Sequence, residues 1–219
     1  QLMLVTIEKK KRIQTDVNFI EKQKVTELYS KQRVYFNKDL SKLVSYPDMN
    51  DWWIGITIGE FWIGDFGAAD LARISVHLSP VQNYGLIFSV SVQNMADLGN
   101  GVMIWENYST YKVPTEEWIT IEMGYKMGND KTGRFIMTAQ SKNDPAPVEI
   151  INVTNWTYSN KPYVTEPIPL WRWNAQKVYT SDNVMNWIRG TDPKNEKFIE
   201  VLWDDFQFST KLPNRAPFK

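Results

Sequence analysis

The sequence predicts an all-β fold, a β-sandwich of two antiparallel sheets. Short runs that alternate polar and apolar residues recur along most of the 219 residues, the segments between them carry Gly, Pro, Asn and Asp, and helix signals are few. No low-complexity linker or internal repeat divides the chain, so we expect residues 1–219 to form one domain with an irregular tail at 210–219. The runs give eleven candidate strands, at residues 2–8, 12–19, 26–36, 52–62, 72–79, 85–93, 117–127, 133–141, 148–156, 176–181 and 198–209.

The connections between these runs predict turns, short helices and two long loops. Residues 128–133, "GNDKTG", separate two strong strand signals and predict a hairpin with a longer loop. Residues 94–115 and 155–175 are aromatic-rich stretches that we expect to be irregular, because loops of that length often form the rims of functional sites.

Helix signals occur at two places. Residues 37–47, "NKDLSKLVSYP", allow one or two turns before a proline, and residues 181–190, "SDNVMNWIRG", predict a short helix. Ser181 or Asp182 is the expected N-cap of this second helix, and Gly190 is its expected end.

Composition excludes several classes of function. Lys and Arg total 25 and Asp and Glu total 25, so the net charge is zero, and no long basic block is present to follow a nucleic acid backbone. The absence of Cys excludes disulfides and thiolate catalysis, and a single His argues against a zinc site. The apolar run within the first ten residues is too short for a transmembrane segment, and it lacks the basic flank of a signal peptide. Because the chain begins at Gln, we expect that a targeting segment has been removed.

Several predicted strands carry planar hydrogen-bonding groups on one face. Amide, guanidinium and hydroxyl groups can form hydrogen bonds with the hydroxyl and carboxylate groups of sugars, and nearby Trp or Tyr rings can stack on the apolar faces of pyranose rings. The alternative is that these are only the solvated faces of an antiparallel sheet. The groups concerned are Arg12, Gln14, Asp16 and Asn18; Arg33 and Tyr35; Arg73, Ser75 and His77; and Ser89, Ser91 and Gln93.

Two further strands carry charged residues of interest. In residues 52–62, Glu60 ends an apolar face, so it either lies at the rim or is redirected by a bulge at Gly59. A lone Glu there is more often a structural hydrogen-bond acceptor than a catalyst. In residues 176–181, Lys177 and Tyr179 share a face about 7 Å apart, a spacing that suits proton transfer. Taken by itself, the pattern is more often that of an exposed amphipathic strand.

Four stretches resemble the concanavalin A-like lectin/glucanase jelly rolls, particularly bacterial polysaccharide-lyase-like proteins. They are "VPTEEWITIEMGYKMGNDKTGRFIMTAQ" at 113–140, "INVTNWT" at 151–157, "KVYTS" at 177–181 and "VLWDDFQF" at 201–208. The resemblance implies a jelly roll and a site for a polysaccharide or oligosaccharide on a concave sheet. It also implies export to the periplasm or cell surface of a bacterium.

The resemblance further implies roles for individual residues in a lyase reaction. Such lyases need a group to neutralise the uronate carboxylate, a base for the C5 proton and an acid for the departing O4. By analogy, Arg12 or Gln14 would bind the carboxylate, His77 would be the base or charge neutraliser, and Tyr179 the acid, or both acid and base. Ser75 stands where the Gln of a Q-x-H strand would be.

The hydrolase branch of these jelly rolls is not indicated. It uses an E-x-D-x-x-E strand, which this sequence lacks, and the two Asp of "WDDFQF" fall on opposite faces. No cofactor is required for the lyase reaction, although such folds often hold a structural calcium. Its ligands could include Asp97, Asp130, Asp204 or Asp205.

The sequence therefore predicts recognition or processing of a polysaccharide, with three alternatives open. The protein is a lyase-like enzyme on an acidic glycan, a non-catalytic glycan-binding protein, or a structural module of a surface assembly. The predicted catalytic residues are His77, Tyr179, Arg73 and Lys177. The predicted substrate-binding residues are Gln14, Arg33, Tyr35, Glu60, Gln93, Trp105, Trp171 and Trp173.

Overall fold

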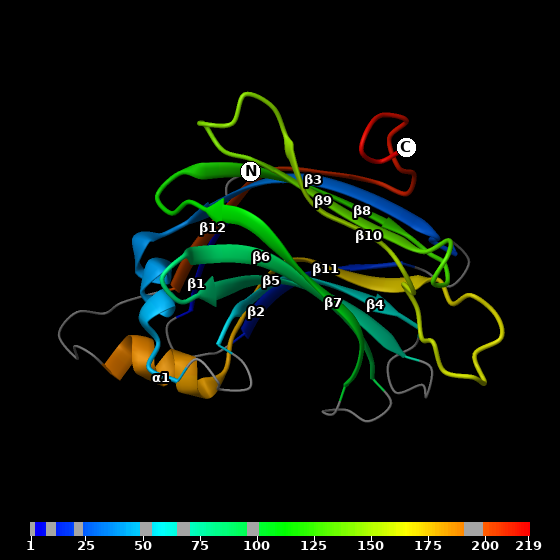
Figure 1. Ribbon diagram of the computed structural model, residues 1–219, viewed down its shortest axis with the longest axis horizontal. Helices are drawn as coiled ribbons and strands as arrows, with labels where there is room; N and C mark the ends of the chain where they lie inside the picture. The colour runs from blue at the N-terminus through cyan, green and yellow to red at the C-terminus, as the bar shows by residue number, and fades with distance from the viewer. Residues whose placement is uncertain are drawn as a thin grey trace.

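The chain folds into two six-stranded antiparallel sheets that pack face to face (Figure 1). The computed structural model describes residues 3–7, 12–19, 24–48, 54–64, 71–95, 101–190 and 199–219. The outer sheet has the order β1 (Met3–Ile7), β12 (Ile199–Ser209), β3 (Glu27–Phe36), β8 (Trp118–Lys126), β9 (Arg134–Gln140) and β10 (Val148–Thr154). The cleft sheet has the order β2 (Arg12–Asn18), β11 (Leu170–Tyr179), β4 (Ile56–Ile63), β5 (Ala72–Val81), β6 (Gly85–Asn94) and β7 (Val102–Val113). The predicted all-β jelly-roll sandwich is confirmed.

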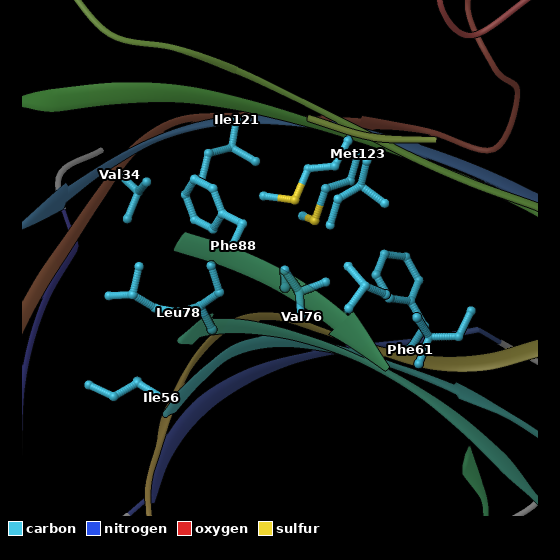
Figure 2. Packing of buried hydrophobic residues seen from close by; sticks show 14 of the residues in the cluster. Val34, Ile56, Phe61, Val76, Leu78, Phe88, Ile121 and Met123 are labelled. Carbon is cyan, nitrogen blue, oxygen red and sulfur yellow. The ribbon is translucent and has the colours of Figure 1, made fainter. Parts of the chain in front are cut away.

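Apolar side chains from the inner faces of both sheets form the core. Figure 2 shows Val34 and Ile121 of the outer sheet above Val76, Leu78 and Phe88 of the cleft sheet. All five side chains are buried, with at most 1% of their surface exposed. Burying one such side chain contributes roughly 1.5–3 kcal/mol, so this alternation of apolar residues is what holds the sheets together.

The strand predictions hold except in the two long stretches that we expected to be irregular. Residues 94–115, which we expected to be irregular, contain β7, an edge strand that pairs with β6. Its burial pattern is irregular and mostly exposed, which explains why alternation did not reveal it. In the second stretch, 155–175, residues 155–169 are irregular, but residues 170–175 belong to β11, which begins at Leu170, six residues before the predicted strand. Residues 52–53 of another predicted strand lie outside the described ranges.

Two helical segments close one end of the sandwich: the 3₁₀ helix η2 (Lys38–Ser45) and α1 (Asp182–Gly190) (Figure 1). Ser181 is the N-cap of α1, because its Oγ accepts a hydrogen bond from the Val184 backbone N–H at 3.2 Å. Val184 and Ile188 extend the core beyond the strands. Neither of these described helices is long and apolar enough to span a membrane.

The C-terminal segment, residues 210–219, consists of turns and bends and lies over the outer face of the outer sheet (Figure 1). Arg215 donates to the buried carboxylate of Glu122 at 2.6 Å. The ring of Phe218 meets Tyr29 edge-on, 5.3 Å between centroids, and occupies space that Gly124 leaves open. A Cβ at Gly124 would lie 2.7 Å from the Phe218 ring, so this glycine makes room for the segment.

Candidate functional site

Two bulges decide which side chains of the cleft sheet point away from the core. In β4, Thr57 pairs with His77 but Gly59 pairs with Val76, so one extra residue lies between them. That extra residue reverses the alternation and turns Glu60 away from the core, as the bulge prediction required. A second bulge lies between Asn174 and Gln176 in β11 and resets the phase of that strand.

The strand register then aligns the residues that point away from the core, on the cleft side of this sheet, in three rows that cross the strands. The first, the Tyr179 row, is Arg12, Tyr179, Thr57, His77, Ser89 and Tyr108. The second, the Glu60 row, is Asp16, Asn174, Glu60, Ser75, Ser91 and Glu106. The third, the Arg73 row, is Arg172, Trp62, Arg73, Gln93 and Met103. Lys177, paired with Gln14, follows the bulge between the first two rows.

Members of all three rows line a cleft of about 820 Å³. The volume lies within the range of about 300–1,000 Å³ that is usual for ligand sites. Small hydroxyl side chains contribute to its lining, namely Thr57, Ser75, Ser79, Ser89 and Ser91. Short side chains there leave space above the sheet, which the longer charged and aromatic residues surround.

Glu60 lies at the centre of the cleft's charge cluster, with 1% of its surface exposed. Its Oε2 accepts hydrogen bonds from Lys177 Nζ and, at 3.1 Å, from the Trp62 indole. Its Oε1 lies 3.6 Å from Arg73 Nη1. One carboxylate thus pairs with two cations, and this attraction offsets part of the free energy needed to remove their charges from water.

Lys177 is also buried, with 1% of its surface exposed. Burial lowers the pKa of Lys177 to about 8, the Glu60 carboxylate opposes that change, and the charges of Arg12 and Arg73 add to it. The alternative of an exposed amphipathic strand is therefore wrong for this residue. Lys177 carries a positive charge at neutral pH but loses it readily in mild alkali.

His77 lies on the cleft floor and is 8% exposed. Its Nδ1 is 3.2 Å from Thr57 Oγ1 and its Nε2 is 3.0 Å from Ser91 Oγ, so a hydroxyl group meets each ring nitrogen. Burial lowers the pKa of His77 to about 3, and the charges of Arg73 and Lys177 act in the same direction. The imidazole is neutral at physiological pH.

Tyr179 stands beside two cations. The Arg12 guanidinium lies over its ring at 4.6 Å from the centroid, and Lys177 Nζ is 5.6 Å from the same centroid. Positive charge at this range stabilises negative charge that develops on the phenolic oxygen.

The Arg73 row combines guanidinium groups with an indole. Arg73 and Arg172 flank Trp62 from the neighbouring strands, at 5.5 and 5.3 Å from its ring centroid. Arg73 also donates to Gln93 Oε1 at 2.5 Å. Such stacked and hydrogen-bonded guanidinium groups hold a fixed orientation and suit bidentate binding of a carboxylate.

The cleft brings together eight of the residues singled out from the sequence. Six of these come from three strands of the cleft sheet, β5, β6 and β11, and Gln14 and Glu60 come from two more, β2 and β4. The eight are His77, Tyr179, Arg73, Lys177, Gln14, Glu60, Gln93 and Trp171.

The structure places four other predicted residues away from the cleft. Arg33 and Tyr35 belong to β3 of the outer sheet, where Arg33 lies over Trp118 at 4.9 Å from the ring centroid. Trp105 is buried, and its indole donates to the Trp156 carbonyl at 2.7 Å. Trp173 is fully buried, because the β11 bulge turns it into the core. These four residues therefore do not line the cleft, and their predicted contact with a substrate stays a prediction.

Sequence reasoning missed other residues that line the cleft. Trp62 and Arg172 build the Arg73 row, and the alternation of Glu60 with Trp62 was a signal for the first of them. Tyr108 and Glu106 lie on the unpredicted strand β7 at the cleft's edge, where the Tyr108 hydroxyl donates to Glu106 at 3.0 Å. Burial and this carboxylate raise the pKa of Tyr108.

The candidate calcium ligands do not form one site in the described part of the chain. No group of three or more His, Asp or Glu side chains in those ranges is arranged to hold a metal ion. Asp205 pairs with Arg33 at 3.4 Å, and Asp97 lies outside the described residues. A structural calcium stays a prediction.

Comparison with known proteins identifies the fold. No family model matches the sequence, and no curated protein matches it significantly. Among solved structures, the endo-β-1,4-glucuronan lyase of the fungus Trichoderma reesei is similar with a TM-score of 0.55 and 14% identity, over 96% of this chain and 80% of that chain. The PL-14 alginate lyase of Aplysia kurodai has a TM-score of 0.52 and 9% identity, over 86% of this chain and 71% of that one.

Alginate lyase Aly36B is a third similar structure, with a TM-score of 0.50 and 11% identity over 94% of this chain and 72% of that chain. At these identities the likeness establishes the jelly-roll fold that the chain shares with these lyases. A shared fold does not specify an activity, which depends on the residues that line the cleft.

Proposed function

We propose that the protein binds an acidic polysaccharide in this cleft and cleaves it by β-elimination. One observation carries the proposal: Arg12 and Lys177 both lie beside the Tyr179 ring, in a cleft that also presents Arg73 with Gln93. This set contains a proton-exchanging group, charges that stabilise its anion, and a guanidinium suited to a uronate carboxylate. The lyases with the same fold support the proposal as an analogy.

In the proposed reaction, Arg73 binds the uronate carboxylate and stabilises the negative charge that spreads onto it when the C5 proton leaves. Tyr179 reacts as its phenolate, with the positive charges of Arg12 and Lys177 beside its ring, and takes that proton. The C5–H electron pair forms the C4=C5 double bond as the C4–O4 bond breaks. The tyrosine then returns the proton to the departing O4, so the step is balanced with no other reactant.

His77 takes neither of its expected roles in this proposal. A neutral imidazole cannot neutralise a carboxylate, and a pKa of about 3 makes it a poor base. Its contacts with Thr57 and Ser91 instead join β4, β5 and β6 beneath the substrate. His77 is thus proposed to shape the cleft floor.

The test is to incubate the protein with a panel of uronate-containing and neutral polysaccharides. We expect ultraviolet absorbance from the unsaturated product with at least one uronate polymer and none with neutral polymers. Tyr179→Phe keeps the ring and removes the hydroxyl, so we expect it to lower the rate at least about 100-fold, the lower range for a general acid or base. A fully active Tyr179→Phe would contradict the proposed mechanism.

The second candidate is a non-catalytic glycan-binding protein that uses the same cleft. The observation that favours it is that both nitrogens of His77 are engaged with hydroxyl groups, as in a structural residue. If no uronate polymer yields an unsaturated product while affinity gels still retain the protein, this candidate replaces the lyase. Export to a cell surface or periplasm is part of either proposal and stays a prediction.

A further inference from the structure

The structure assigns to Glu60 a positioning role: we propose that its buried carboxylate fixes Lys177 and Arg73 as a pair of cations beneath the substrate and does not itself touch the sugar. This inference rests on the proposed function, since it names the group that organises the proposed site. It concerns a residue whose expected role, from the sequence, was binding substrate.

The geometry separates Glu60 from the substrate. Only 1% of its surface is exposed, and both carboxylate oxygens are directed at protein groups. Oε2 accepts from Lys177 and Trp62, while Oε1 faces Arg73. A carboxylate placed against a uronate would also repel it, so burial behind two cations is the arrangement that anion binding needs.

The contacts of Trp62 make the carboxylate's position rigid. The same indole N–H donates to Asn174 Oδ1 at 2.8 Å, and Asn174 donates in turn to Asp16. Three strands, β2, β11 and β4, therefore hold Glu60 in place through neighbouring members of the rows. A network satisfied at each of these steps keeps one geometry.

Lys177 depends on Glu60 for its charge. The charged and titratable groups near it are Arg12 from β2, Glu60 from β4, Arg73 and His77 from β5, and Tyr179 on its own strand. Glu60 is the one carboxylate among the groups that act on the pKa of Lys177, and His77 is neutral. Without Glu60, burial and two guanidinium charges would favour the neutral amine. Lys177 would then no longer stabilise the Tyr179 phenolate.

The first test reads the Lys177 ammonium directly and needs no substrate. Lysines labelled with nitrogen-15 are followed by NMR against pH, with Lys177→Met to assign the signal. We expect Glu60→Gln to move the titration midpoint of Lys177 down by about one to three pH units, the usual effect of one nearby opposite charge. Glu60→Asp, which keeps the charge, should stay near the wild type. Glu106→Gln removes a carboxylate from the same row and is the matched control, whose midpoint should not move.

The second test uses the rate of β-elimination against pH. We expect wild-type activity to fall above about pH 8, as Lys177 loses its proton, and the fall in Glu60→Gln to begin at lower pH. If Glu60 were merely structural, Glu60→Gln would lower the rate at every pH but would not change the pH at which the alkaline fall begins. An unchanged midpoint of Lys177 or an unchanged limb in Glu60→Gln would overturn the inference. If the wild type cleaves no polymer, the proposed function fails, and the NMR result still decides the role of Glu60.

Folding of the variants is controlled by a double substitution. Glu60→Gln leaves a buried cation with less compensation, whereas Glu60→Gln with Lys177→Met removes both charges. If the single variant does not fold and the double variant does, Glu60 is shown to hold Lys177 as a buried cation, which supports the inference. If both fail while Glu60→Asp also fails, the carboxylate is needed for packing alone and the inference is wrong.

Discussion

Replacing His77 should make the protein more resistant to acid. His77 is the single histidine of the chain, so it alone among the side chains has an ordinary pKa near 6.5 in the unfolded state. In the folded protein, burial lowers that pKa to about 3. Between these two values the unfolded chain binds a proton that the folded chain excludes, so stability is complete above pH 6.5 and is lost as the pH falls toward 3.

The size of this loss follows from the same two values. Each tenfold change in the protonation equilibrium corresponds to about 1.4 kcal/mol, so relative to pH 7 the wild type should lose about 1.3 kcal/mol by pH 5.5 and about 2.5 kcal/mol by pH 4.5 through His77. His77→Gln keeps a neutral side chain with a donor and an acceptor for Thr57 and Ser91, but it does not titrate. Its stability should therefore fall less over the same range.

The assay is urea unfolding of both proteins by tryptophan fluorescence at pH 7, 5.5 and 4.5. The quantity of interest is the difference between the two free energies of unfolding, because the carboxylates common to both proteins cancel in it. We expect the difference to change by about 2.5 kcal/mol in favour of His77→Gln between pH 7 and 4.5. If the two stability curves run parallel, His77 is protonated in the folded protein, and the argument that it cannot neutralise a carboxylate fails.

Two further predictions concern parts of the fold outside the cleft. Ser181→Ala removes the hydroxyl that accepts from the Val184 N–H, so we expect a loss of about 1 kcal/mol in the free energy of unfolding, while Ser181→Asp should retain most of the stability. An unchanged stability in Ser181→Ala would show that the cap does not contribute. Gly124→Ala places a Cβ 2.7 Å from the Phe218 ring, so the C-terminal segment must shift. Trypsin should then cut after Arg215 faster than in the wild type, and equal cleavage rates would contradict the contact.

Alternation in the sequence predicts most of the fold because each strand has one face in the sandwich core. It predicts which residues share a face within a strand, as Lys177 and Tyr179 do. It does not tell which sheet a strand joins, and so it grouped Arg33 and Tyr35 with the residues of the opposite sheet. It also does not show β7, an edge strand whose backbone pairing, more than its side chains, places it in the sheet.

Bulges account for the remaining differences at the site. Counting by twos from Tyr179 puts Trp173 on the cleft face, but the extra residue before Lys177 sends it into the core. In β4 a bulge has the opposite effect: it turns Glu60 out of the core and into the cleft. The burial of Lys177 could not be predicted at all, because it depends on Glu60, which is 117 positions away in the chain.

The crossing of the rows over the strands has a consequence for how firmly each part of the cleft is held. Glu60 and His77 belong to β4 and β5, in the middle of the sheet, where local opening is rarest and amide hydrogen exchange is slowest. Arg12 and Tyr108 belong to β2 and β7, the two edge strands, which fray first. If a glycan binds along the Tyr179 row, its middle sugar would contact rigid strands and its outer sugars would contact strands that open more often. The proposed site would then be most selective for the identity of the middle sugar and would accept more variation in the sugars on either side.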